Sequence, residues 1–189
     1  MDIGTCADPK ILLKSGGCPA GWSYYWGTRK CYKHDTTKRS WNDALTFCQN
    51  SASNLSSTLA SVHDLETNLF IRDLGLTGEG DDAWLGGSQD KQDNWSWDDN
   101  TVFGDYTNWG WSEPNNAGGN EDHLAMKFKF GTGLWTDFNG LTSDTGAICQ
   151  CDSTVTLTAG TDIDLEVLSV PDDLILTTAT EFCGKPGKK

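Results

Sequence analysis

The chain has 189 residues, enough for one domain with a sizeable core and for terminal extensions. Its formal net charge of −13 makes nucleic acid and anionic membrane surfaces poor partners. No apolar run approaches the length of a membrane-spanning helix, so we expect a soluble chain that does not insert into a membrane.

Seven cysteines are spread widely along the chain, in a pattern that fits no zinc motif. With only three histidines, a disulfide framework is the better interpretation, and it implies an oxidising, extracellular compartment. The odd count leaves one thiol that is either free or links two chains. These cysteines are Cys6, Cys18, Cys31, Cys48, Cys149, Cys151 and Cys183.

The first predicted element is a hairpin. Residues 1–17 show no strong periodicity and are predicted to form an N-terminal arm. Residues 18–35 are rich in aromatic and β-prone residues, and a Gly-Thr pair lies between Cys18 and Cys31. This pattern predicts a hairpin closed by a disulfide.

Two helices are predicted next. Ser40 is the candidate N-cap of the first, and the apolar residues after it recur at i, i+3, i+4 and i+7, which directs Cys48 into the core. The second helix is predicted over about 64–74, with apolar i,i+4 pairs that begin at Leu65. Gly75 follows as its predicted C-terminal stop.

Helical periodicity disappears over 76–122, and so long an irregular segment inside a compact domain is usually functional. Short strands are predicted inside it at 84–86 and 95–97. Residues 79–122 hold eleven acidic residues and one basic residue. A folded acidic segment needs its repulsion relieved, and carboxylate and amide oxygens are the ligands that Ca²⁺ prefers. A solvated acidic loop explains the charge equally well.

Strand-like alternation resumes at 124–130, and further short strands are predicted at 134–138 and 146–151. Residues 152–180 contain no Trp and alternate in places, which predicts either an extra hairpin or an extended tail.

The segment richest in candidate ligands is Glu113-Pro114-Asn115. A cis bond before the proline would make a tight turn that aims both side-chain oxygens the same way. Further carboxylates at Glu121 and Asp137 would complete a cage for Ca²⁺, which takes about six to eight oxygen ligands and so keeps positions open for two neighbouring sugar hydroxyls. Each hydroxyl can also donate to a carboxylate or accept from an amide. The candidate metal ligands and sugar-binding residues are Glu113, Asn115, Glu121 and Asp137.

This pattern resembles the C-type lectin family from about Cys18 to Cys151. The features that agree with the family stand in its order along the chain. They are Cys18 and Cys31, Cys48, Leu59-Ala-Ser-Val-His63, Trp84-Leu-Gly86, Glu113-Pro-Asn115, Trp135-Thr-Asp137 and Cys149.

The resemblance implies an α+β, C-type lectin-like fold, with two helices flanking small antiparallel sheets and a long calcium-binding loop lobe. The lectin-like domain would span residues 18–151, between the arm of residues 1–17 and a β-prone C-terminal extension or tail over 152–189.

The resemblance also implies the disulfides Cys18–Cys31 and Cys48–Cys149. We expect Cys151 to pair with Cys183, which leaves Cys6 over; pairing of Cys6 with either of these two is the alternative. The cysteine left over offers a route to a disulfide-linked dimer.

By the same resemblance, the function expected is calcium-dependent binding of glycans by a secreted lectin. The order Glu-Pro-Asn goes with mannose-type sugars in the family, namely mannose, glucose, N-acetylglucosamine and fucose, whereas Gln-Pro-Asp goes with galactose. The family often binds a second Ca²⁺ nearby, and here Asn116, Glu121 and Asp122 stand at matching places, with further ligands expected near Asp90 and Asp93.

The sequence departs from the family at two places. The cysteines of a second disulfide across the lobe would fall at about His123 and Leu141, and both are absent, so the lobe should depend more on Ca²⁺ for order. Thr136 replaces the usual Asn ligand, and a hydroxyl is a poorer Ca²⁺ ligand than an amide oxygen.

Two other functions compete with sugar binding. Paired carboxylates also occur in glycosidases, but nothing here separates an acid from a base, and no Gly-x-Ser-x-Gly motif is present, so we expect no enzyme activity. The serious rival is a family member that recognises a protein, mineral or ice surface. Thr136 favours this rival, and the intact set of four candidate ligands favours sugar.

Overall fold

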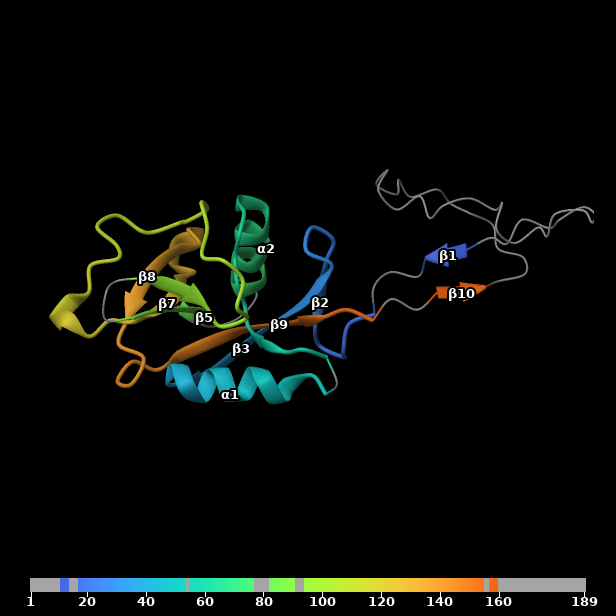
Figure 1. The fold of residues 1–189 in the computed structure, drawn as a ribbon, viewed down its shortest axis with the longest axis horizontal. Helices are drawn as coiled ribbons and strands as arrows, with labels where there is room; N and C mark the ends of the chain where they lie inside the picture. Colours follow the sequence, from blue (N-terminus) through green and yellow to red (C-terminus); the bar gives the residue numbers. More distant parts are fainter. Residues whose placement is uncertain are drawn as a thin grey trace, which may run out of the picture. The chain divides into compact units, whose positions relative to one another are not determined.

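Figure 1 shows the fold in a computed structural model, which describes residues 11–13, 17–53, 55–76, 82–90, 94–154 and 157–159. Cys6, Cys183 and most of the two terminal segments lie outside the described residues. Contacts divide the chain into two units, of which the larger is Gly16–Thr154. In the smaller unit, β1 (Ile11–Leu13) pairs antiparallel with β10 (Leu157–Ala159), so this part of the C-terminal extension pairs with the N-terminal arm.

The larger unit is built on one eight-stranded sheet. Six strands run in the order β2-β3-β9-β5-β7-β8, while β4 pairs with β9 and β6 with β5. The strands are β2 (Ser23–Tyr25), β3 (Lys30–Arg39), β4 (Thr58–Leu59), β5 (Asp82–Gln89), β6 (Trp95–Trp97), β7 (His123–Lys127), β8 (Leu134–Phe138) and β9 (Thr145–Asp152).

The α+β class is confirmed, with one correction to the sheet. The strands β5 and β9 pair in parallel, so the sheet is mixed rather than made of small antiparallel sheets. A parallel pair needs a long connection, and here the chain between β5 and β9 includes the irregular lobe and the strands β6, β7 and β8. The alternation predicted through residue 130 also ends early, because η2 (Lys129–Gly131) is a 3-10 turn.

The first helix, α1 (Trp41–Ser51), begins and packs as predicted. Ser40 accepts a hydrogen bond from the Asp43 backbone N–H at 3.3 Å, and Trp41, Ala44 and Cys48 are buried. The helix packs against β4 and β9 (Figure 1).

The second helix, α2 (Leu65–Leu76), differs from the prediction at its end and on its buried face. It continues through Gly75 to Leu76. Its buried residues are Thr67, Asn68, Ile71 and Gly75, whereas Leu65 is half exposed. The Phe128 ring occupies the space that a side chain at position 75 would need, so close packing inside the helix, rather than a helix stop, accounts for this glycine.

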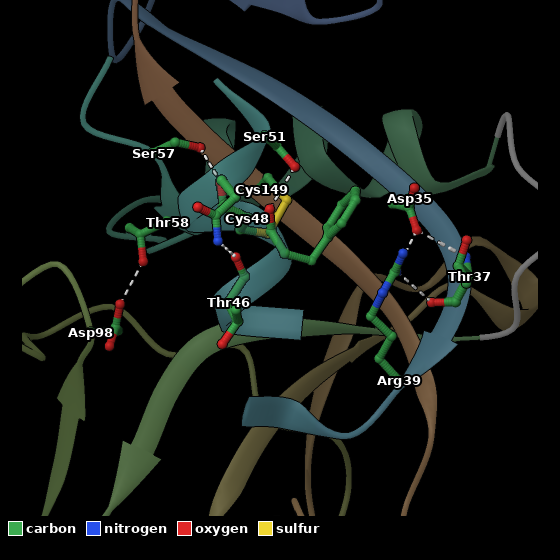
Figure 2. Close-up of a disulfide and its surroundings, with 12 residues drawn as sticks. Asp35, Thr37, Arg39, Thr46, Cys48, Ser51, Ser57, Thr58, Asp98 and Cys149 are labelled. Carbon is green, nitrogen blue, oxygen red and sulfur yellow. Dashed lines mark hydrogen bonds and ion pairs between the residues drawn. A yellow bond between two sulfur atoms is a disulfide. The ribbon is translucent and has the colours of Figure 1, made fainter. Parts of the chain in front are cut away.

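Both disulfides implied by the family resemblance are present. Cys18–Cys31 closes the β2–β3 hairpin, and Cys48–Cys149 joins α1 to β9 across 101 residues (Figure 2). In the chain-entropy account, a bridge that closes so long a loop stabilises the fold by roughly 4–5 kcal/mol.

The expected partner of Cys151, Cys183, lies outside the described residues, so the Cys151–Cys183 bridge stays a prediction. Among the described residues Cys151 has no disulfide partner, and it lies fully buried in a cluster with Cys31 and Ala52. Burial raises the pKa of this thiol to about 11.

His123 fills the place where the family's second disulfide is missing. Its ring lies 4.3 Å from the Trp41 ring, centre to centre, and covers Gly140, beside the position of the second missing cysteine. Its Nδ1 lies 2.6 Å from a carboxylate oxygen of Asp122. Burial lowers the pKa of His123, against the opposing effect of Asp122. The neutral ring is therefore the form that this packing favours.

Acidification should weaken this packing. The pKa of His123 in the fold lies below the ordinary value of 6.5. The stability that the neutral ring contributes is therefore fully present above pH 6.5, and it is lost as the pH falls from 6.5 through the lowered pKa. Burial lowers the pKa of His34 as well, so the wild type has two such groups. The free energy of unfolding in urea, measured at about pH 7.5 and about pH 5.5, should fall less between these two pH values in His123→Phe than in wild type. An equal loss in both proteins would contradict the assignment.

Candidate functional site

The candidate site is a loop fixed to the edge strand β8. Trp109 forms a bridge with Trp135, and the Gly110 N–H donates to the Trp135 carbonyl at 2.8 Å. The Glu113 N–H then donates to the Gly110 carbonyl at 3.0 Å and closes a tight turn. The backbone of the loop is therefore tied to β8 just before the motif Glu113-Pro114-Asn115.

The motif has the shape that its sequence predicted. The Glu113–Pro114 bond is cis. The Asn115 side-chain Nδ2 donates to Glu113 Oε1 at 2.9 Å, so the carboxylate and the amide lie side by side. An acceptor and a donor group thus stand next to each other at the surface of the loop.

Asp137 joins this motif to the sheet. Its side chain is 1% exposed, and its two oxygens accept the backbone N–H groups of Asn115 at 3.0 Å and Asn116 at 2.7 Å. A carboxylate that accepts two backbone hydrogen bonds fixes the path of the chain that donates them. Each oxygen keeps a second lone pair for another partner.

Glu121 lies on the far side of the same loop. Its Oε2 accepts the Ala117 N–H at 2.8 Å, and its own N–H donates to the Asn116 side chain at 3.0 Å. Asn116 has a left-handed backbone with φ of 45°, which turns the chain back toward Glu121. The structure therefore brings Glu113, Asn115 and Asp137 into direct contact. Glu121 is connected to them only through its hydrogen bonds with Asn116 and Ala117 in the same loop.

Thr136 has a role that the sequence did not reveal. Its hydroxyl donates to Glu113 Oε2 at 3.0 Å and lies 3.3 Å from the Asp137 carbonyl oxygen. The residue that replaces the family's Asn ligand thus orients one of the candidate ligands.

The electrostatics of the site favour a positive charge. Burial raises the pKa of Glu113, and the neighbouring carboxylate of Asp137 raises it further, outweighing the hydrogen bonds from Thr136 and Asn115. Two like charges held this close disfavour the state in which both are ionised. A cation between them would relieve that repulsion.

The donor set fits Ca²⁺ only if it includes an amide. Within the described part of the chain, no three His, Cys, Asp or Glu side chains lie close enough together to hold a metal ion. The side-chain oxygen of Asn115 therefore has to supplement the carboxylates of Glu113 and Asp137. All of these are the hard oxygen ligands that Ca²⁺ prefers.

Other acids of the lobe serve the fold. Asp99 accepts hydrogen bonds from Ser61 at 2.6 Å and Gln150 at 2.8 Å, and it also bonds Thr101. Burial alone would raise the pKa of Asp99, but these hydrogen bonds outweigh it and hold the pKa below its usual value. Asp98 accepts from Thr58 on β4 (Figure 2). Sequence reasoning missed this network because its donors lie about 40 and 50 residues away.

Among the described residues considered for a second Ca²⁺, no three acidic side chains cluster. Asp122 contacts His123, Asp90 accepts from Asn94, and Asp93 lies outside the described residues.

The fold combines a mixed sheet, two helices, a long loop lobe and the Cys48–Cys149 bridge between α1 and β9, and it matches solved C-type lectin domains. The family model of the lectin C-type domain matches residues 37–151 of this chain. The chain therefore belongs to the C-type lectin domain family.

Three known proteins show how the family varies. Ladderlectin from Oncorhynchus mykiss is 36% identical over 125 residues, which cover 65% of this chain and 62% of ladderlectin. A calcium-independent type II antifreeze protein matches with a TM-score of 0.61 and 28% identity, covering 76% of this chain and 96% of that one. The cow C-type carbohydrate-recognition domain of CD23, solved in the presence of a GlcNAc2Man3 oligosaccharide, matches with a TM-score of 0.61 and 29% identity, covering 71% and 95%.

The family consists of binding domains rather than catalysts, so the chain is not an enzyme. Among the described residues, no helix is both long and apolar enough to cross a membrane.

Glu113 provides a direct test of the site's charge balance. Since its pKa in the fold is raised above the ordinary 4.5, Glu113 contributes stability that is present below 4.5 and is lost as the pH rises through the raised value. With a chelator at neutral pH, Glu113→Gln should therefore raise the free energy of unfolding in urea. Glu66→Gln, at an exposed position in the first turn of α2, is the matched control. A clear loss of stability in Glu113→Gln alone would show that the two carboxylates do not repel each other.

Proposed function

We propose that this protein binds mannose-type sugars in a calcium-dependent manner, through Glu113, Asn115, Glu121 and Asp137. The observation that carries the proposal is the pair of side chains of Glu113 and Asn115, held side by side on a loop that the buried Asp137 fixes. The likeness to a carbohydrate-recognition domain solved with an oligosaccharide supports the same function.

The oxygens of Glu113, Asn115 and Asp137 would hold the ion. Glu121 would become a further ligand by moving its side chain closer to the other two carboxylates. Bound there, Ca²⁺ supplies coordination positions for the oxygens of two neighbouring sugar hydroxyls. The chain's own groups set the direction of those hydroxyls. One hydroxyl donates to the Glu113 carboxylate, and the other accepts from the Asn115 amide.

This donor and acceptor order is the basis for the predicted preference. A carboxylate before an amide suits the equatorial 3- and 4-hydroxyls of mannose, glucose and N-acetylglucosamine, and the equivalent pair of fucose. Exchanging the two groups would reverse the required hydroxyl directions. The site is an open loop that buries few ligand atoms, so we expect a dissociation constant on the order of millimolar for one sugar.

Secretion and multivalency belong to the same proposal. The disulfides Cys18–Cys31 and Cys48–Cys149 suit an oxidising, extracellular compartment. Weak single sites need clustering to be effective, and a disulfide through Cys6 would bring two domains together.

A second candidate function is recognition of ice without calcium. The specific observation in its favour is the hydrogen bond from Thr136 to Glu113, which uses a carboxylate oxygen that a calcium ion would otherwise contact. The likeness to a calcium-independent antifreeze protein points the same way. This candidate predicts thermal hysteresis that a chelator leaves unchanged.

A glycan array with and without EDTA separates the two candidates. Wild-type protein should bind mannose-type glycans in Ca²⁺ and lose them in EDTA. Asp137→Asn should lose at least about 90% of this binding, because it removes a charged oxygen from the site and one acceptor from the loop. Asp105→Asn, at an exposed acid in the same lobe, is the matched control and should bind normally. Binding that survives EDTA would overturn the proposal.

The preference itself is tested by exchanging the two groups of the motif. The double variant Glu113→Gln with Asn115→Asp should bind galactose better than mannose, because the acceptor and the donor change places. Competition by the two monosaccharides on an immobilised glycan measures the ratio, which we expect to shift by roughly tenfold or more. A variant that keeps the wild-type order of preference would show that this pair does not select the sugar.

A further inference from the structure

Trp111 is the most exposed large hydrophobic side chain among the described residues, at 95% exposure. Most Trp side chains of the chain are packed in the domain. Trp41, Trp84, Trp97 and Trp135 are buried, and Trp22, Trp95 and Trp109 are partly buried against the core. Trp111 therefore contributes nothing to the core, although it lies in the lobe where its neighbours form an aromatic cluster.

The turn that carries Trp111 is rigid. Trp111 lies between Gly110, whose N–H bonds the Trp135 carbonyl, and Ser112, whose left-handed φ of 64° is that of the third residue of a type II turn. The hydrogen bond from the Glu113 N–H to the Gly110 carbonyl closes the turn. The backbone of Gly110 lies directly against Trp135 and the Glu113 side chain, which leaves Trp111 on the outer side of the turn.

The position of this turn links Trp111 to the candidate sugar site. Trp111 is two residues before Glu113, so their Cα atoms lie no more than roughly 7 Å apart. The strand that anchors the turn through Trp135 continues into Thr136 and Asp137. A solvent-exposed ring and the candidate ligands are thus held by the same piece of backbone.

We propose that the Trp111 indole forms a second, apolar subsite, which contacts the sugar residue linked to the one held by Glu113 and Asn115. This inference rests on the proposed function. A pyranose has a face of C–H groups that packs on an aromatic ring, while its hydroxyls remain in water or on polar groups. Because the turn is already ordered, little conformational entropy is lost when the ring makes this contact. The subsite selects oligosaccharides over single sugars.

Calorimetric titration with methyl α-mannoside and with an α-linked mannotriose, both in Ca²⁺, tests this subsite. Wild-type protein should bind the trisaccharide about five- to tenfold more tightly than the monosaccharide. Trp111→Ala should lose this advantage and keep its monosaccharide affinity within about twofold, whereas Trp111→Phe should keep most of the advantage. Trp26→Ala, at a Trp that is 64% exposed on the β2–β3 hairpin, is the matched control and should behave as wild type.

Fluorescence gives a second measurement on the same proteins. The trisaccharide should shield the exposed indole from acrylamide quenching in wild type and not in Trp111→Phe. A trisaccharide advantage that survives in Trp111→Ala, or that is absent from wild type, overturns the subsite while leaving the proposed function intact. Failure of wild type to bind either sugar overturns both. Equal loss of both sugars in Trp111→Ala also overturns the subsite, since it places the ring at the first sugar.

Discussion

The carboxylate of Asp137 lies almost fully buried in β8 and accepts the backbone N–H groups of both Asn115 and Asn116. These two hydrogen bonds join a surface loop to the edge of the sheet. Because the loop is fixed from below, the side chains of Glu113 and Asn115 lie side by side at its surface. Burial raises the pKa of Glu113, and the same carboxylate raises it further, so the group that orders the loop also adds to the negative charge around Glu113. The order of the loop and its negative charge thus depend on one residue.

Three sets of contacts hold the described part of the lobe, which lacks the second disulfide of the family. Rings of Trp97, Phe103 and Trp109 pack around the fully buried Trp135. The His123 ring packs at a tilt against Trp41, where the missing bridge would lie. A partly buried network around Asp99 joins the segment after β6 to the segment after β4 and to Gln150 on β9. The acids of the lobe therefore have two roles. Some, such as Asp99, stabilise the fold by accepting hydrogen bonds from neutral donors, and others, such as Glu113, belong to the candidate cation site.

Local sequence patterns predicted the features that depend only on residues close together in the chain, such as helix starts and turns. Ser40 begins a helix, and Glu113-Pro114-Asn115 forms the expected cis turn. Contacts between distant residues were beyond such reasoning. Gly75 was expected to end a helix, yet it lies inside the helix, and the Phe128 ring, more than 50 residues later in the chain, leaves no room for a side chain there. Thr136 was interpreted as a weak ligand, and only the folded chain shows that it donates to Glu113. The resemblance to a family supplied the Cys48–Cys149 pairing, which no local pattern determines.

We propose that the loop fixed by Asp137 is already arranged for a calcium ion. A crystal structure of the protein grown with calcium chloride and methyl α-mannoside provides the most direct test. We expect an ion at about 2.3–2.6 Å from oxygens of Glu113, Asn115 and Asp137, with two sugar hydroxyls completing its coordination. The loop should keep the hydrogen bonds from the Asn115 and Asn116 backbone to Asp137. A well-ordered loop with neither ion nor sugar between these side chains, at calcium concentrations far above the physiological range, would show that the loop is not a calcium site.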